Sequence, residues 1–198
     1  KGGIQYFKTI ALTQKTMKVT LSTIVLAAIF LCCGNNKQQA QKVAGDEKWS
    51  IKMANSVMSQ NDSLIYYLGS RHPRWAYDVA FVGQAIDRLG NIDPKYSAYM
   101  KDYIDYFIQD DASVIDYKLM EYNIDRINPA KNILTLYKRT GDSLYRKALG
   151  QFVKQMESHP RTNAGGYWHK KIYPWQMWLD GIYMASPFLA QYAKEFNK

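Results

Sequence analysis

Two capped helix starts, 49 residues apart, constrain the fold more than any other feature of this 198-residue chain. The segments Asp93–Tyr96 and Asp142–Tyr145 each place an aspartate three residues before a tyrosine, and each follows a turn that contains glycine. An aspartate at this position caps a helix because its side chain accepts a hydrogen bond from a free backbone N–H of the first turn. The interval is about the length of one helical hairpin with its connections, so the sequence predicts repeated α/α-hairpins.

Apolar residues recur at helical spacing from Trp49 onward, and the alternation typical of β-strands is scarce. Asn128-Pro129 repeats the Asp93-Pro94 device, with a capping side chain before a proline in the first turn. About three hairpins fit in residues 49–198, so we expect an all-α fold, either a short α-solenoid or part of a closed toroid. The predicted helices cover Trp49–Met58, Arg74–Leu89 with Gly90 as the C′ residue, Asp93–Ile108, Asn128–Thr140, Asp142–Glu157 and the apolar part of Gln176–Phe196.

Composition adds two constraints on function. Aromatic residues make up 14% of the chain, and such rings either pack in a core or line a sugar-binding cleft. The net charge is +9, but residues 1–34 hold four lysines and no acid, which leaves 22 basic and 17 acidic residues and a net charge of +5 for residues 35–198. Because these charges are interleaved, we expect no nucleic-acid partner, whereas an acidic glycan is compatible with them.

The N-terminal region has the features of an export signal. Met17-Lys18 precedes an apolar run of 11 residues, Leu21–Leu31, which is too short to span a bilayer. The only two cysteines of the chain, Cys32 and Cys33, follow directly. Adjacent cysteines rarely bridge each other, so a lipoprotein signal over residues 17–33, with lipid attached to Cys33 or Cys32, explains them best. An ordinary cleaved signal and an uncleaved anchor are the alternatives.

The rest of this region follows from that interpretation. Residues 1–16 are expected to be upstream translation of a start at Met17, and residues 34–46 to be a polar tether between membrane and domain. We therefore expect an exported protein, lipid-anchored in the cell envelope, in the periplasm or on the outer surface.

Two acidic residues lie in segments that suit chemistry. Asp125 precedes the helix start at Asn128-Pro129, where the helix amides favour a carboxylate; a structural turn acid is the alternative. Asp180 lies in a strongly apolar run, where burial would raise the pKa of its carboxyl group, as a general acid requires; a hydrogen-bonded core acid is the alternative. A loop presents His169 and Lys170, and His169 alone is more often structural. No metal-ligand spacing or phosphate-binding loop is evident, so we expect neither metal nor cofactor.

Longer segments around these residues carry a resemblance to known enzymes. YKLMEYNIDRINPAKNIL and SHPRTNAGGYWHKKIYPWQMWLDGIYMASPFLAQYA, together with RWAYDVAFVGQAI and TGDSLY, resemble glycoside hydrolase family 105, the unsaturated rhamnogalacturonyl hydrolases, and the related family 88 glucuronyl hydrolases. The resemblance implies a six-hairpin (α/α)6-barrel, of which this chain would form an incomplete half-ring with exposed inner helix faces. It also implies a truncated chain that is weakly active or inactive alone, because the family's later subsite residues have no counterpart here.

The resemblance also implies the site and the reaction. Asp180 matches the catalytic aspartate in MWLDG, and Asp125 matches a second active-site aspartate in NIDRINP. The implied substrate is an unsaturated uronyl oligosaccharide: the enzyme would remove 4,5-unsaturated galacturonic acid from the non-reducing end of lyase-cleaved rhamnogalacturonan, in pectin degradation, by hydrating the C4=C5 bond. A non-catalytic glycan-binding lipoprotein or an inactive remnant is the alternative. The implied substrate-binding residues are His169, Lys170, Trp178, Tyr77 and Trp75.

Overall fold

The computed structural model describes residues 47–198, and its folded part, Trp49–Lys198, is all-helical. These residues form six α-helices, with three short 3-10 helices between them, and no β-strand. None of the helices in this part is both long and apolar enough to cross a membrane. The α-helices are α3 (Trp49–Gln60), α4 (Tyr77–Asp87), α5 (Pro94–Phe107), α6 (Ala130–Thr140), α7 (Ser143–Ser158) and α8 (Gly181–Phe196), and the 3-10 helices are η1 (Leu64–Gly69), η2 (Leu119–Glu121) and η3 (Ile124–Arg126).

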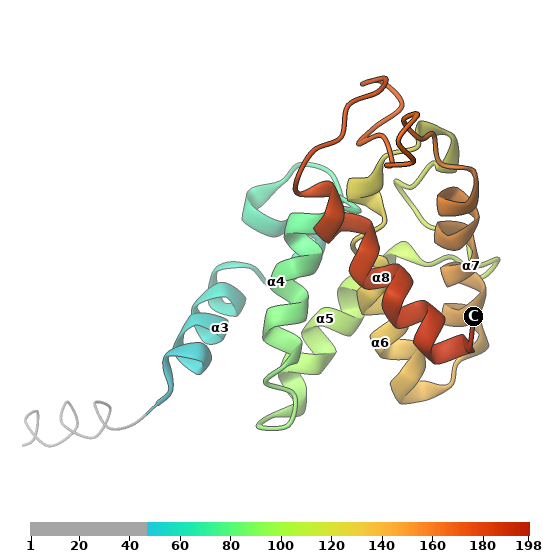
Figure 1. Cartoon of the computed structure of the whole chain (residues 1–198). Helices are drawn as coiled ribbons and strands as arrows, with labels where there is room; N and C mark the ends of the chain where they lie inside the picture. Colours follow the sequence, from blue (N-terminus) through green and yellow to red (C-terminus); the bar gives the residue numbers. More distant parts are fainter. Residues whose placement is uncertain (1–46) are drawn as a thin grey trace, which may run out of the picture. The chain divides into compact units, whose positions relative to one another are not determined.

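The helices of Trp49–Lys198 pair as hairpins that pack side by side (Figure 1). α4 packs against α5, α6 packs against α7, and α5 joins the two pairs by packing against α6. α8 lies along α6 and contacts η3. The tight turns within the two hairpins lie at one end, and the segments that lead into α4, α6 and α8 lie at the other (Figure 1).

Both capped helix starts that the sequence predicts are confirmed. Asp93 and Asp142 each accept a hydrogen bond from the backbone N–H two residues on, at 2.9 and 2.8 Å. The tyrosines that follow, Tyr96 and Tyr145, are both buried. The 49-residue echo therefore marks the first turn of the second helix in each hairpin.

Two predicted helix-end residues have other roles. Asn128 does not cap α6: its side-chain amide donates to the backbone carbonyl of Tyr183 at 3.1 Å and so ties the start of α6 to α8. Gly90 is not the C′ residue of α4, which ends three residues earlier. A Cβ atom at Gly90 would lie 1.9 Å from Oγ of Ser97, so close packing against α5 explains the glycine.

Two helices begin later than predicted because their leading residues form other hydrogen bonds. Before α4, the backbone N–H of Trp75 donates to the Asp116 carboxylate at 3.1 Å, which holds this segment extended. Before α8, the backbone carbonyl of Gln176 accepts from the N–H of His169 at 2.7 Å. Both of these late helix starts lie at the end of the hairpins that also holds the predicted site residues.

Aromatic rings fill the core between the hairpins. The rings of Tyr103, Phe107 and Phe152 lie 5.5 to 6.2 Å from that of Trp75, and all four side chains are fully buried. Phe188 of α8 packs on Phe152 at 6.3 Å. Much of the aromatic content therefore serves core packing, one of the two uses that the composition allowed.

Some large apolar side chains of the helices are exposed. On α4, Phe81 is 54% exposed, and on α8, Ile182 is 64% exposed. Where exposed large apolar side chains lie next to one another, they form a surface for binding or aggregation.

A partly buried ion pair fastens α4 to α6: the Asp87 side chain is buried, and that of Arg139 is 44% exposed. The Arg139 guanidinium holds both carboxylate oxygens of Asp87, at 2.5 and 2.7 Å, and Asp87 is only 6% exposed. We expect Arg139→Met to lower the free energy of unfolding by about 2–4 kcal/mol, since it leaves a buried carboxylate unpaired. Lys101→Met, which removes the exposed ion pair with Asp105 on α5, is the matched control and should cost less than about 1 kcal/mol. Urea unfolding followed by circular dichroism measures both, and equal costs would contradict the assignment.

The predictions for the N-terminal region lie outside the described residues. These are the upstream segment 1–16, the signal 17–33 with Cys32 or Cys33 as the lipid attachment site, and the tether 34–46.

Candidate active site

Three helix starts meet at the open end of the hairpins. Tyr77 begins α4, Asp125 lies in η3 just before α6, and Asp180 directly precedes α8. Tyr77 and Asp125 line the same cleft, and α8 contacts η3, so the three starts face a common space (Figure 1). The N-termini of helices carry partial positive charge, which favours an anionic ligand there.

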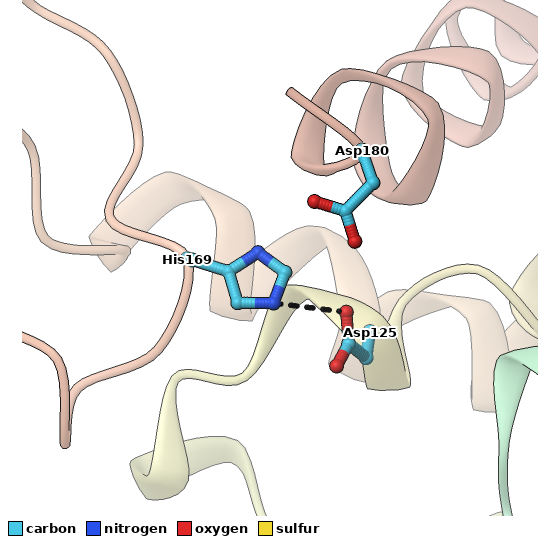
Figure 2. A group of neighbouring side chains, drawn as sticks. All are labelled: Asp125, His169 and Asp180. Carbon is cyan, nitrogen blue, oxygen red and sulfur yellow. Dashed lines mark ion pairs between the residues drawn. The ribbon is translucent and has the colours of Figure 1, made fainter. Parts of the chain in front are cut away.

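Asp125 is the centre of a small ionic cluster. Its Oδ2 lies 2.8 Å from Nζ of Lys170, and its Oδ1 lies 3.3 Å from Nε2 of His169 (Figure 2). The local backbone produces this arrangement: Asn123 and Lys170 form an antiparallel bridge, and the N–H of Ile124 donates to the carbonyl of His169 at 3.2 Å. The segment around Asp125 is therefore bound to the loop that carries His169 and Lys170.

His169 is fixed by burial and by stacking. The side chain is 1% exposed, and its ring stacks on that of Trp178 at 4.0 Å between centroids with a 13° interplanar angle. Trp178 in turn lies against Tyr173 at 5.5 Å and is 43% exposed. Nδ1 of His169 is buried without a hydrogen-bond partner in the described part of the chain. His169 is therefore a rigid wall of the site rather than a mobile side chain.

Asp180 points from the start of α8 into the same space (Figure 2). One oxygen of its carboxylate, one of Asp125 and a ring nitrogen of His169 all lie within 4.8 Å of one another. The prediction that Asp180 is buried is wrong, because the residue is exposed in this structure. The apolar neighbours in the sequence, including Leu179 at 87% exposed, do not cover it.

Gly181 allows this approach. A Cβ atom there would lie 2.8 Å from Cδ1 of Ile124 and 3.6 Å from Nδ1 of His169. Glycine therefore lets the first turn of α8 come close to η3 and brings Asp180 to Asp125.

A cleft of about 240 Å³ opens beside Asp125. Its charged side chains are largely paired: Arg74 with Asp78 at 3.0 Å, and Arg126 with Asp116 of the neighbouring loop at 2.7 Å. Tyr77, 40% exposed, offers an aromatic surface on the α4 side. The lining residues are Arg74, Ala76, Tyr77, Asp78, Asn123, Asp125, Arg126 and Lys170.

The prediction that Trp75 contacts substrate is wrong. Its side chain is 0% exposed, and its indole N–H donates to the backbone carbonyl of Arg126 at 3.0 Å. A fully buried ring cannot touch a sugar. Trp75 instead supports the cleft from beneath, because it holds Arg126, the neighbour of Asp125.

The cluster of Asp125, His169 and Asp180 has the ligand types of a divalent-metal site. The ammonium group of Lys170 already neutralises Asp125 at 2.8 Å and would repel a cation bound beside it. The arrangement therefore suits acid–base chemistry better than metal binding.

Comparison with known proteins shows the family of this chain. The profile of Glycosyl Hydrolase Family 88 matches residues 49–198, which include every residue of the cluster. The chain belongs to glycosyl hydrolase family 88. A solved glycoside hydrolase of family 105 from C. acetobutylicum ATCC 824 is 40% identical to this family 88 chain, with a TM-score of 0.70. The match covers 77% of this chain and 41% of that one, so this chain spans less than half the length of that neighbour.

These matches confirm the predicted resemblance and the predicted fold class, an all-α toroid of α/α-hairpins. The structure brings together Asp125, His169, Lys170, Trp178 and Asp180, with Tyr77 across the cleft.

Sequence reasoning missed the residues that support the cluster. Arg126 and Asp116 are in this group. So are Gln155 of α7 and His159, the residue directly after α7, which bond to the two segments that carry Asp125 and His169. Arg126 follows Asp125 directly, so the motif itself was the available signal for it. The sequence held no comparable signal for Gln155 and His159, because a Gln and a His four residues apart are common in and around any helix.

Proposed function

We propose that this family 88 protein is a glycoside hydrolase that removes a 4,5-unsaturated uronic acid from the non-reducing end of lyase-cleaved rhamnogalacturonan oligosaccharides. The observation that carries the proposal is the approach of Asp125 and Asp180 within 4.8 Å, beside a buried histidine, in the segment that the family profile matches. The two carboxyl groups have different surroundings: Asp125 is paired with Lys170, while Asp180 is exposed and has no hydrogen-bond or ion-pair partner in the described part of the chain. In the proposed reaction Asp180 is the proton donor and Asp125 orients the water.

The reaction is a hydration of the enol-ether C4=C5 bond. The carboxyl group of Asp180 gives its proton to C4, and the ring oxygen stabilises the cation that develops at C5. Water then adds at C5 and returns a proton to the Asp180 carboxylate, with Asp125 orienting the water. The product is a hemiketal at C5, which opens and releases the remaining sugar. The spacing rule for retaining and inverting glycosidases does not apply, because neither displacement at the anomeric carbon nor a glycosyl-enzyme intermediate occurs.

The charges of the cleft fit a uronate. Three cationic side chains and two acidic ones line it, and the N-terminus of α4 lies at its edge. Lys170 is the cation nearest to the acid pair, and the substrate carboxylate would share it with Asp125. Tyr77 and Trp178 are sufficiently exposed to contact the sugar.

The assay is direct. The protein is incubated with lyase-treated rhamnogalacturonan oligosaccharides, and loss of the enol-ether absorbance is followed together with release of the uronate-derived keto acid. The rival function, a glycan-binding lipoprotein, predicts saturable binding of the same oligosaccharides without loss of absorbance. Lyase-treated glucuronan-type oligosaccharides, run in parallel, distinguish a glucuronyl from a rhamnogalacturonyl preference.

The membrane partner is a separate proposal. The cysteines at the end of the apolar run support attachment of the exported protein to the cell envelope through Cys33 or Cys32. Metabolic labelling with a radioactive fatty acid tests it, and labelling that survives replacement of both cysteines by serine would contradict it.

Lys170→Met should lower kcat/KM for the unsaturated oligosaccharide by about 10- to 100-fold, because it removes the cation shared by Asp125 and the substrate carboxylate. Lys171→Met is the matched control: Lys171 is exposed, lies over the Tyr122 ring at 5.7 Å, and does not line the cleft beside Asp125. Steady-state kinetics at two salt concentrations measure both, and the control should stay within about twofold of the parent. Equal losses in the two variants would show that only the general charge of the loop matters.

A further inference from the structure

A buried pair at the C-terminal end of α7 connects the two segments that carry the candidate catalytic residues. Gln155 of α7 is 0% exposed, and His159, the residue that directly follows α7, is 4% exposed. The two side chains are in contact, with Gln155 Nε2 3.3 Å from His159 Nδ1. Neither residue lines the cleft described above.

Gln155 holds the segment of Asp125. Its Oε1 accepts a hydrogen bond from the Tyr117 hydroxyl at 2.7 Å, and its Nε2 donates to the backbone carbonyl of Asn123 at 3.2 Å. Asn123 in turn accepts at its side-chain oxygen from the backbone N–H of Asp125, at 3.1 Å. The Gln155 amide is therefore two hydrogen bonds away from the backbone of the candidate catalytic residue.

His159 holds the segment of His169 and Lys170. Its Nε2 lies 2.8 Å from the backbone carbonyl of Trp168, which can only accept, so the ring carries its hydrogen on Nε2. Nδ1 of the neutral ring is then an acceptor and faces the donating amide of Gln155. One neutral tautomer of His159 thus satisfies every polar atom of the pair.

We propose that Gln155 and His159 are positioning residues of the active site, which clamp the Asp125 segment and the His169–Lys170 loop in register only while His159 is neutral. The expected effect on kinetics rests on the proposed function. The expected effect on the position of the two segments rests on the hydrogen-bond network alone. Protonation of His159 would put a second N–H against the Gln155 amide. Rotating that amide to accept it would turn an oxygen toward the Asn123 carbonyl, and the bond to the Asp125 segment would be lost.

The surroundings of His159 favour the neutral form. Burial lowers the pKa of its imidazole, the nearby charges of Arg161 and His169 lower it further, and the Trp168 carbonyl opposes them. The rings of Tyr122 and Tyr167 pack edge-on against the imidazole at 5.5 Å each. Since the pKa in the folded protein lies below the unfolded value of about 6.5, the stabilisation from His159 is complete above that pH and is lost as the pH falls through the folded pKa.

Two substitutions separate the hydrogen bond from the titration. In His159→Gln the side-chain amide takes the place of Nε2 and still donates to Trp168, but it cannot be protonated. In His159→Phe the volume is kept and both bonds are lost. His72→Gln, at an exposed histidine far along the sequence, is the matched control.

Long-range proton–nitrogen NMR of the imidazoles gives a readout that does not depend on activity. In the parent protein we expect His159 as the Nε2–H tautomer, titrating below the ordinary histidine range. His159→Phe should displace the ring signals of His169, while His159→Gln and His72→Gln should leave them in place. An Nδ1–H tautomer, an ordinary titration of His159, or unmoved His169 signals in His159→Phe would overturn the proposal.

Kinetics test the link to the proposed function. We expect kcat/KM of His159→Phe to fall about 10- to 100-fold at about pH 7, with His159→Gln within about threefold of the parent. The ratio of His159→Gln to parent activity should rise as the pH falls through the lowered pKa of His159, because only the parent loses the clamp. A ratio that stays constant with pH would overturn the proposal. Absence of turnover in the parent would instead contradict the proposed function, and the NMR result would still decide the clamp.

Discussion

Asp180→Asn should lower kcat/KM for the unsaturated uronyl oligosaccharide by about 10³-fold or more, within the range expected when a general acid is removed. The amide has nearly the shape of the carboxyl group and cannot give a proton to C4. Since Asp180 is exposed and makes no side-chain bond within residues 47–198, the substitution should leave folding unchanged. The expected signature is therefore lost turnover with retained oligosaccharide binding and an unchanged melting temperature.

A control variant and a second active-site variant make this result decisive. Glu157→Gln, at an exposed acid of α7 away from the cleft, should keep the parent rate. Asp125→Asn should also lose most activity, because it removes the partner of Lys170 and the group that orients water. Unchanged turnover in Asp180→Asn would remove the catalytic assignment, and binding that is indifferent to both aspartates, without turnover in the parent, would favour the glycan-binding alternative.

The largest effect on folding is expected at Trp75. Trp75→Ala should lower the free energy of unfolding by about 3–5 kcal/mol, because it empties a fully buried site surrounded by three aromatic rings. It also leaves the Arg126 carbonyl without the indole N–H. A loss of this size is a large fraction of the stability of an ordinary domain, so a substantial unfolded population is expected at ambient temperature.

Trp49→Ala is the matched control for Trp75→Ala. Trp49 is 83% exposed at the start of α3, so its removal should change the free energy of unfolding by less than about 0.5 kcal/mol. Circular dichroism in urea measures both variants without relying on tryptophan fluorescence. A Trp75→Ala protein as stable as the control would contradict the core position and would restore Trp75 as a candidate for sugar contact.

The elements that local sequence could predict are those determined by nearest neighbours. The caps at Asp93 and Asp142 depend on a few adjacent residues, and the structure confirms them. Asn128 shows the limit of this reasoning, because a residue suited to capping found a better partner on a helix more than 50 residues later. The late starts of α4 and α8 have the same cause, since bonds from distant segments replaced the first helical turns.

The site shows the same division. The motifs located Asp125, His169, Lys170 and Asp180, and the structure brings these residues together. Their burial could not be predicted in the same way. Asp180 was expected inside because its sequence neighbours are apolar, yet those neighbours are themselves exposed, whereas Trp75 was expected at the sugar and lies in the core. Whether a side chain is buried depends on the other segments that pack against it. These segments lie far away in the sequence, so the residues next to it in the sequence do not reveal them.

The arrangement of the hairpins has a consequence for how this protein can change over evolution. The segments that carry the acid pair leave the helices at one end, while the turns after α4 and α6 close the hairpins at the other (Figure 1). Insertions, exchanges of residues or attached modules at those turns are separated from the cluster of Asp125, His169 and Asp180 by the full length of the helices. The turns after α4 and α6 can therefore vary in length and charge, or carry added modules. The residues of the cluster at the opposite end are under separate selection.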